Sequence, residues 1–243
     1  MNTDQTIEQL KTLRLAGMAR RYEAVTALPL HEVQNVHELM GSMVQAEIEH
    51  RDFSRTQKYL KASRLRYSAL PEEITCNAER GITREQVLRL SDGSFIQKAE
   101  NVLITGATGC GKSFLACALG RSACLLGYRT MYFNMNRFMD MVTQSKLEGT
   151  YIKWLKSLSN HKLLILDDFG LKGIDANSRL ALLDILEDRY GVSSVVITSQ
   201  LPVEAWYNFI DEPTLADAIM DRLTASAHRM ELQGKSLRKK KNH

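Results

Sequence analysis

Residues 106–113 have the composition and spacing of a loop that surrounds phosphate groups. They read GATGCGKS, which places Gly106, Gly111, Lys112 and Ser113 in the pattern GxxxxGKS. Glycines let successive backbone N–H groups turn inward around phosphate oxygens, and the lysine of such a loop reaches the β- and γ-phosphates. We therefore expect ATP and Mg²⁺ as cofactors, with the nucleotide held by Gly106, Ala107, Thr108, Gly109, Cys110, Gly111, Lys112 and Ser113.

The flanking sequence favours this interpretation over a glycine-rich turn without a ligand. An apolar run at residues 102–104 precedes the loop, and residues 114–126 carry apolar positions at helical spacing. A strand before the loop and a helix after it are the context that the motif requires, because the helix directs its positive end at the same anion. With average residue usage, the pattern arises by chance in about one chain in a hundred of this length.

Two acids end the apolar run at residues 162–166. Charges are costly next to such a buried strand unless a cation holds them. We predict that Asp167 positions Mg²⁺ together with Ser113, and that Asp168 orients or deprotonates the attacking water. The alternative is a strand whose acids only mark where the chain meets solvent.

Another apolar run, at residues 195–197, also ends in polar side chains. In a parallel sheet the carboxyl ends of the strands face the ligand crevice. Thr198, Ser199 or Gln200 could therefore hydrogen-bond the attacking water or the γ-phosphate, and Gln200 is our candidate catalytic residue. An ordinary polar strand end is the alternative.

Arg222 is the fourth candidate catalytic residue, after Lys112, Asp168 and Gln200. An arginine delivered from a neighbouring subunit accelerates phosphoryl transfer by about 10³ to 10⁵. A surface ion pair with Asp221 or Asp217 is the alternative.

Five short β-branched or apolar runs alternate with helical stretches in the second part of the chain. The alternation predicts an α/β fold in which helices flank a five-stranded parallel sheet. The expected strands lie at residues 101–105, 129–133, 162–167, 194–199 and 229–232.

The first part of the chain has helical spacing without strand-like alternation. One helix should carry Leu10, Leu13, Leu15 and Met18, and another should follow the break at Pro29. We predict a small N-terminal helical domain at residues 1–70, a linker at 71–98 and an ATPase domain at 99–243.

Composition permits a nucleic-acid partner without requiring one, since the formal net charge is +4. If the second helix continues past Glu49, it carries a row of basic side chains that could contact DNA. The alternative is an ordinary helix face exposed to solvent. The first choice for DNA contacts is Arg51, Arg55, Lys58, Lys61 and Arg64, and the alternative is Lys146, Lys153 and Lys156 beside Trp154.

No apolar run approaches the roughly 18 residues that cross a bilayer, so we expect no membrane partner and a cytoplasmic location. The cysteines lack the spacing of a metal site and are expected to be small, reduced core residues. They are Cys76, Cys110, Cys117 and Cys124.

Taken together, these residues resemble the AAA+ ATPases, and more narrowly the IstB/DnaC-like family of transposase helpers and helicase loaders. The narrow features are RGI at 80–82, ALG at 118–120, DDFG at 167–170, ITSQLPV at 197–203 with Trp206, ADAIMDRL at 216–223 and GKSLR at 234–238. The resemblance implies an ATP-bound homo-oligomer that assembles on double-stranded DNA and passes the target to a transposase. It also implies that Arg222 acts on a neighbouring subunit and that Arg238 lies near the γ-phosphate.

The chain departs from the AAA+ pattern at two places. Asp168 stands where most AAA+ enzymes carry glutamate, and too few residues follow Leu223 for a full C-terminal lid. Two alternative functions therefore stay open. One is a helicase loader that favours single strands, and the other is an assembly module that ATP switches with negligible turnover.

Overall fold

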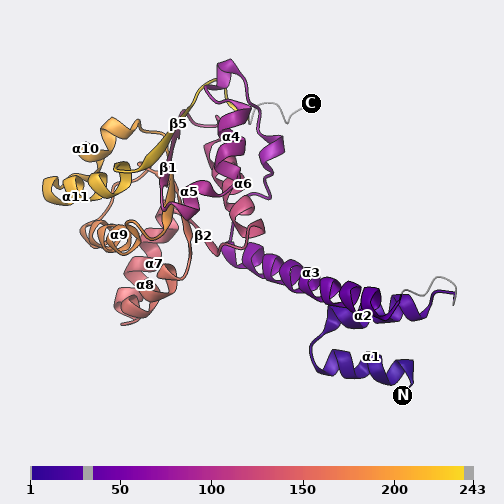
Figure 1. Cartoon of the computed structure of the whole chain (residues 1–243). Helices are drawn as coiled ribbons and strands as arrows, with labels where there is room; N and C mark the ends of the chain where they lie inside the picture. Colours follow the sequence, from indigo (N-terminus) through magenta and orange to yellow (C-terminus); the bar gives the residue numbers. More distant parts are fainter. Residues whose placement is uncertain (1, 30–34, 238–243) are drawn as a thin grey trace. The chain divides into compact units, whose positions relative to one another are not determined.

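The computed structural model describes residues 2–29 and 35–237 of the 243-residue chain (Figure 1). The chain divides into two compact units, Met1–Lys58 and Tyr59–His243. We call them the N-terminal unit and the C-terminal unit and describe each by itself. The functional domains predicted at residues 1–70, 71–98 and 99–243 stay a prediction.

The N-terminal unit consists of α1 (Thr3–Thr12), α2 (Ala16–Thr26) and the first part of α3 (Val36–Ser63). The prediction of one helix through Leu10 and Met18 is wrong. Arg14 has a φ of 60°, which is left-handed and ends α1, and Leu13 is 68% exposed beside it. The second predicted helix does continue past Glu49, as far as Ser63.

Glu47 of α3 joins α3 to the start of α2. It is 6% exposed, and its Oε2 accepts the backbone N–H groups of Gly17 (2.8 Å) and Met18 (3.3 Å). Its Oε1 accepts a hydrogen bond from Arg51 Nε at 2.7 Å. The carboxylate thus satisfies two N–H groups that a helix start leaves without partners, and its charge suits the positive end of α2.

Glu47→Ala should destabilise the N-terminal unit by about 1–3 kcal/mol, because it leaves buried N–H groups unsatisfied. Burial works to raise the pKa of Glu47, but hydrogen bonds from Arg51, Met18 and Gly17 hold the pKa below its usual 4.5. The stabilisation should therefore be complete above about pH 4.5 and fade as the pH falls below it. Amide hydrogen exchange in α2 measures the effect; equal protection in the variant and the wild type would contradict it. Glu49→Ala, at an exposed neighbour on α3, is the matched control.

The C-terminal unit is built on a five-stranded sheet, and all its strand pairs are parallel, as predicted. The strands occur in the order β2-β3-β4-β1-β5. Their bounds are β1 (Asn101–Gly106), β2 (Thr130–Asn134), β3 (Leu163–Phe169), β4 (Ser194–Ser199) and β5 (Ala227–Leu232).

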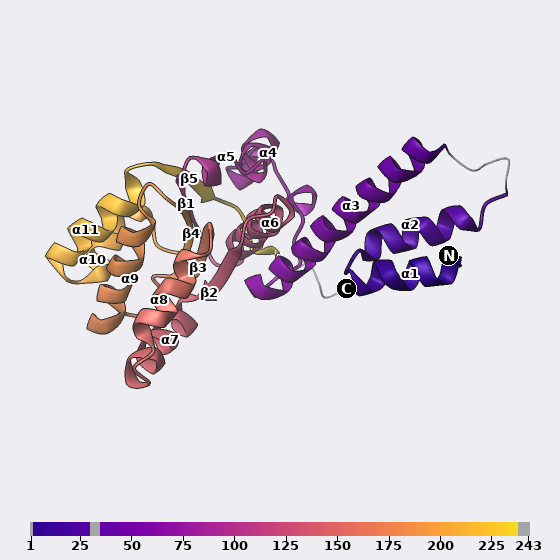
Figure 2. The same ribbon diagram turned by 60° about the horizontal axis from the view of Figure 1, so that its bottom comes forward.

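Helices cover both faces of the sheet (Figures 1 and 2). One face carries α4 (Arg84–Ser91), α5 (Ser94–Gln97) and α6 (Lys112–Leu125), after the short turns η2 (Pro71–Glu73) and η3 (Ala78–Arg80). The other carries α7 (Met135–Leu147), α8 (Tyr151–Ser159), α9 (Ala176–Arg189), η4 (Val203–Ala205), α10 (Trp206–Ile210) and α11 (Pro213–Thr224). None of the helices in the described residues has the length and apolar character to cross a membrane.

The strands are apolar on both sides because both sides are covered. Along β1, Val102 and Ile104 pack toward α6 while Leu103 between them packs toward the other layer. This burial fixes the depth of each strand in the sheet. The residues that follow β1, β3 and β4 are therefore held together at one edge.

The four cysteines are free thiols. Cys110, Cys117 and Cys124 are buried and Cys76 is partly buried. Burial raises the pKa of Cys117 to about 11, which keeps this side chain a neutral thiol.

Candidate nucleotide-binding site

The loop at residues 106–113, which we call the phosphate loop, connects the end of β1 to the start of α6. Gly106 has a φ of 141° and Gly111 a φ of 104°, both in the region that favours glycine. A Cβ at Gly106 would lie 2.1 Å from the carbonyl oxygen of Leu232 on β5. No other residue fits at Gly106, so the loop can lie flat against the end of the sheet.

Lys112 folds back over the phosphate loop. The residue is 6% exposed, and Nζ donates to the carbonyl oxygens of Gly106 (2.7 Å) and Ala107 (2.9 Å). The ammonium group is therefore held inside the loop. The first N–H groups of α6, which have no partners within the helix, begin at the same place.

Asp167 lies at the centre of a hydroxyl network and is fully buried. Its Oδ1 accepts the hydroxyl of Ser113 at 2.8 Å and the hydroxyl of Thr198, and its Oδ2 accepts the hydroxyl of Tyr132 at 2.5 Å. Burial raises the pKa of Tyr132, and its hydrogen bond to Asp167 raises it further, so the phenol stays a donor. The network joins α6, β2, β3 and β4 at one carboxylate.

Asp168 has a left-handed backbone, with a φ of 63°, and the register of β3 against β4 shifts between Leu166 and Phe169. Successive residues of a regular strand face opposite sides of a sheet, and a bulge of this kind re-aims one of them. Asp168 Oδ2 accepts a hydrogen bond from Asn134 Nδ2 at 2.8 Å. The bulge therefore allows both carboxylates to face the same region, although the side chains of adjacent residues in a regular strand point to opposite faces.

Arg66 lies against both acids, a position that the sequence did not reveal. Its Nη1 is 3.6 Å from Asp167 Oδ2 and 3.6 Å from Asp168 Oδ2, and its guanidinium lies 5.3 Å from the ring centre of Tyr67. The available signal was its place two residues after Arg64, the last of the first-choice DNA contacts. The pair of carboxylates thus has a cation from the same chain.

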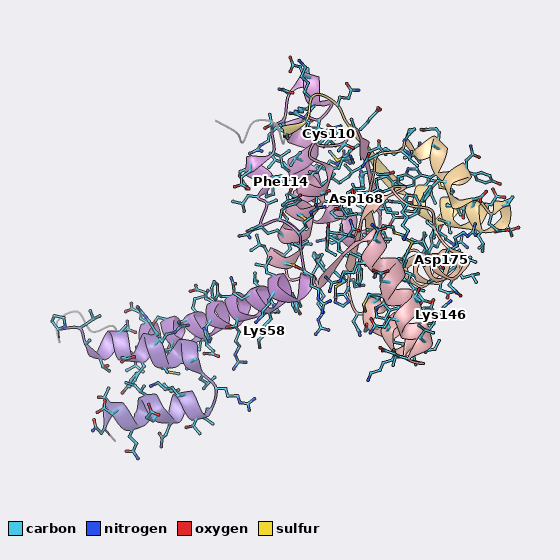
Figure 3. All side chains as sticks on the ribbon, turned by 180° about the vertical axis from the view of Figure 1, so that it is seen from behind. Lys58, Cys110, Phe114, Lys146, Asp168 and Asp175 are labelled. Atoms are coloured by element: carbon cyan, nitrogen blue, oxygen red, sulfur yellow. The ribbon has the colours of Figure 1, made fainter. Side chains whose placement is uncertain are left out.

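A cavity of about 400 Å³ opens beside the phosphate loop. Residues from the loop, Asp168, Gln200, Arg80 and Leu237 line it, and Figure 3 labels Cys110, Phe114 and Asp168 around this part of the unit. The volume lies within the roughly 300–1,000 Å³ that ligand pockets occupy. Asp167 lies behind Ser113 and does not line it.

Of the three polar residues that end β4, Gln200 lines the cavity. Its Oε1 accepts the hydroxyl of Thr108 at 2.7 Å, which ties it to the phosphate loop. Thr198 instead bonds Asp167 and accepts the N–H of Asp168 at 3.1 Å, while Ser199 donates to the carbonyl of Phe169 at 2.6 Å. These two hydroxyls hold the acids in place.

The residues after β5, which we call the C-terminal segment (residues 233–237), return to the phosphate loop. The N–H of Leu237 donates to the carbonyl of Gly109 at 2.9 Å, and Arg80 Nη1 donates to the carbonyl of Lys235 at 3.1 Å. The described residues end at Leu237, and the absence of a full C-terminal lid stays a prediction. Arg238 lies outside the described residues.

Arg222 lies at the opposite end of the strands from the phosphate loop. Its backbone carbonyl accepts a hydrogen bond from Asn101 at the start of β1. Its side chain pairs with Glu187 (Nε, 3.1 Å) and Asp221 (Nη1, 2.5 Å) and lies 4.7 Å from the ring centre of Tyr190. Arg222 is thus separate from the other candidate site residues of this chain.

Three of the candidate DNA contacts already have polar partners within the chain. Arg51 is paired with Glu47, and Arg55 is paired with Asp52 at 2.9 Å. On the other candidate surface, Lys146 donates to Asn177 at 3.1 Å.

Trp154 belongs to the core between β2 and the helices. Its ring packs at 5.9 Å from Phe138 and 6.4 Å from Phe133. It is therefore not free to stack on a nucleic-acid base beside Lys153 and Lys156.

The oxygen ligands here fit Mg²⁺ better than they fit a metal with a cage of protein ligands. The described residues contain no group of three or more His, Cys, Asp or Glu that could hold a metal ion. Mg²⁺ is usually bound through one or two carboxylates together with substrate phosphates and water. Ser113 Oγ and Asp167 Oδ1, 2.8 Å apart at the start of α6, are hard oxygen donors of the required kind.

Comparisons with known proteins agree on the kind of protein. A sequence profile of the family described as "IstB-like ATP binding protein" matches residues 8–243. The "Putative insertion sequence ATP-binding protein y4pL" of Sinorhizobium fredii (strain NBRC 101917 / NGR234) is 39% identical over 96% of this chain and 96% of its own. The "Insertion sequence IS1162 putative ATP-binding protein" of Pseudomonas fluorescens is 36% identical over 83% of this chain and 88% of its own.

Solved structures show the same fold. The crystal structure of the DnaC helicase loader has a TM-score of 0.60 and 18% identity, over 69% of this chain and 98% of the loader. The structure of AMPPCP-bound DnaA from Aquifex aeolicus has a TM-score of 0.59 and 20% identity, over 70% of this chain and 51% of DnaA. The predicted AAA+ fold is confirmed, and the chain belongs to the family of IstB-like ATP binding proteins.

Proposed function

We propose that this chain is an Mg²⁺-dependent ATPase that assembles as a homo-oligomer on double-stranded DNA and assists a transposase. One observation carries the ATPase part. The phosphate loop, Lys112, Ser113 and the two acids near the end of β3 meet at one edge of the sheet, beside a cavity large enough for a nucleotide. We place the protein in the cytoplasm, where such a partner is available.

Each residue has a defined role in this proposal. The N–H groups of the phosphate loop and Lys112 bind the phosphates, and Ser113 and Asp167 hold Mg²⁺. Mg²⁺ held by these two residues would neutralise negative charge on the phosphates. Asp168 orients or deprotonates the attacking water, and Gln200 hydrogen-bonds the water or the γ-phosphate.

Arg222 is proposed to act on the nucleotide of a neighbouring subunit. Its pairs with Glu187 and Asp221 hold the side chain at the end of the unit away from its own phosphate loop. An arginine that is separate from its own site and partly exposed suits delivery to another subunit.

The DNA and transposase parts rest on the relatives and on charge. The relatives are named as insertion sequence proteins, and DNA transposition is what an insertion sequence undergoes. In the N-terminal unit, α3 carries Arg51, Arg55 and Lys58 on one helix. The two arginines already have acidic partners, so phosphate contacts would have to replace those pairs.

This protein should bind duplex DNA tightly only with ATP and Mg²⁺. The affinity for DNA should also fall steeply as the salt concentration rises, because each neutralised phosphate contributes about −0.9 to the slope of log K against log[salt]. Fluorescence anisotropy with labelled duplex and single strands at several salt concentrations measures both. Binding that ignores ATP would contradict the proposal. A strong preference for single strands would favour a helicase loader.

The ATP-switched module stays the second candidate, and one observation favours it. Asp168 already bonds Asn134 and lies 3.6 Å from Arg66, so in this arrangement its carboxylate is engaged. Phosphate release measured with and without DNA separates the candidates. A rate equal to that of the buffer in both conditions would favour the switch.

A further inference from the structure

A second cavity lies at the end of the sheet opposite the phosphate loop. It has a volume of about 160 Å³, and Asn101 and Val195 at the start of β1 and β4 line it together with the end of α9. A cavity needs roughly 10–15 Å³ to hold one water, so this one can hold a small polyatomic ion with water. We call it the basal cavity.

The charged side chains that line the basal cavity are all basic. They are Lys98, Arg189 and Arg222, and among the described residues that line it none is acidic. Ser193 and Ser226 add hydroxyl groups that can donate hydrogen bonds. The lining thus offers hydrogen-bond donors and positive charge, which suit a negatively charged ligand.

Arg189 carries the strongest argument, because its charge is buried and uncompensated. The residue is 2% exposed, and within the described part of the chain no carboxylate lies within ion-pair distance of it. Its Nη1 donates to the carbonyl of Leu158 (3.3 Å) and its Nη2 to the carbonyl of Ser194 (2.8 Å), but its Nε has no hydrogen-bond partner. Leaving such a group unsatisfied costs about 1–3 kcal/mol, or more when the group is charged.

Burial lowers the pKa of Arg189 to about 10, so the guanidinium remains protonated at neutral pH. An isolated buried charge is costly unless an opposite charge accompanies it. Arg222 differs in this respect, since Glu187 and Asp221 match its charge. The buried positive charge that lacks a carboxylate partner therefore belongs to Arg189, and the exposed Lys98 adds a second positive charge at the side of the cavity.

We propose that the basal cavity is a second anion site, which binds a phosphate-type oxyanion through Arg189 and Lys98. A tetrahedral oxyanion matches the donors because it accepts hydrogen bonds in several directions at once. Arginine and lysine are the usual partners of phosphate groups. This site is separate from the phosphate loop, and only its occupation by the nucleotide of a second copy rests on the proposed function.

The test compares Lys98→Ala with Lys11→Ala, which removes one lysine charge from the N-terminal unit instead. Sodium phosphate is titrated into each full-length protein and into the wild type by calorimetry, with sodium chloride of equal ionic strength as the blank. We expect Lys98→Ala to weaken phosphate binding by about tenfold, and Lys11→Ala to leave it within about twofold of wild type. Phosphate bound only by the phosphate loop would be equally tight in all three proteins, which would exclude a free ion as the occupant of the basal cavity.

Crystals soaked in tungstate give a direct readout. We expect an anomalous peak within hydrogen-bond distance of Arg189 Nε, whereas a peak confined to residues 106–113 would count against the site. Arg189→Lys, which keeps the charge but removes Nε, should lose the peak in the basal cavity while the protein remains folded by circular dichroism. If that variant does not fold, the Lys98→Ala titration decides.

The phosphate group could be a free ion or the end of a nucleotide bound to a second copy of this chain. Sedimentation with a non-hydrolysable ATP analogue distinguishes the two. A loss of ATP-dependent assembly in Lys98→Ala, without any binding of free phosphate to the wild type, would assign the group to the nucleotide. If neither free phosphate nor assembly responds to Lys98→Ala, the proposal is wrong.

Discussion

Lys112→Ala should weaken ATP binding at least about 100-fold. The ammonium group donates hydrogen bonds to the carbonyls of Gly106 and Ala107 inside the phosphate loop. A bound nucleotide would offer phosphate oxygens to the same group. Hydrogen bonds to charged groups contribute about 1.5–3 kcal/mol each, and every 1.4 kcal/mol is a factor of ten in affinity. Calorimetric titration with ATP and Mg²⁺ measures the loss.

Lys172→Ala is the matched control, since this exposed lysine follows the acids of β3 without lining the cavity. It should bind ATP as the wild type does. The same titration without Mg²⁺ should give weaker binding in the wild type, because Ser113 and Asp167 then lack the ion they are proposed to hold. Unchanged heats in folded Lys112→Ala protein would remove the basis of the ATPase proposal.

Asp168→Asn should lower the rate of ATP hydrolysis by about 10² to 10⁴, the contribution of a general base, while ATP affinity changes by less than about threefold. Asparagine is the suitable replacement because Asp168 has a φ of 63°, and asparagine tolerates the left-handed region. The variant therefore removes a charge without forcing the backbone to move. Steady-state phosphate release and a parallel titration with ATP give the two quantities.

Asp140→Asn, the same change at an exposed position of α7, controls for the lost charge and should keep full turnover. Asp168→Glu extends the comparison. Glutamate restores the carboxylate at the length that most AAA+ enzymes use, but it fits the left-handed backbone less well than aspartate. Turnover that survives in Asp168→Asn would exclude Asp168 as the base.

The sheet and the phosphate loop could be predicted because their signals are local. Strands such as β1 and β3 are buried on both faces and appear as continuous apolar runs. The loop is specified by glycines whose conformation few other residues adopt, as Gly106 and Gly111 show. Because the strands are parallel, the sequence also predicts that the loop lies at their carboxyl ends.

The remaining features depend on contacts between distant parts of the chain. Arg66 is one basic residue in a cluster of several, and nothing beside it in sequence shows that it meets Asp167 and Asp168. The return of Leu237 to Gly109 is equally hidden, because a short polar segment carries no periodicity. The break at Arg14 was missed for another reason, since neither glycine nor proline marks it.

The position of Arg66 bears on the order in which the chain folds and binds its ligands. Two neighbouring carboxylates, one of them fully enclosed, would repel each other in a newly made chain that has met neither nucleotide nor metal. A guanidinium 3.6 Å from each supplies the missing charge from within. The C-terminal unit can therefore complete its fold first and bind its ligands afterwards.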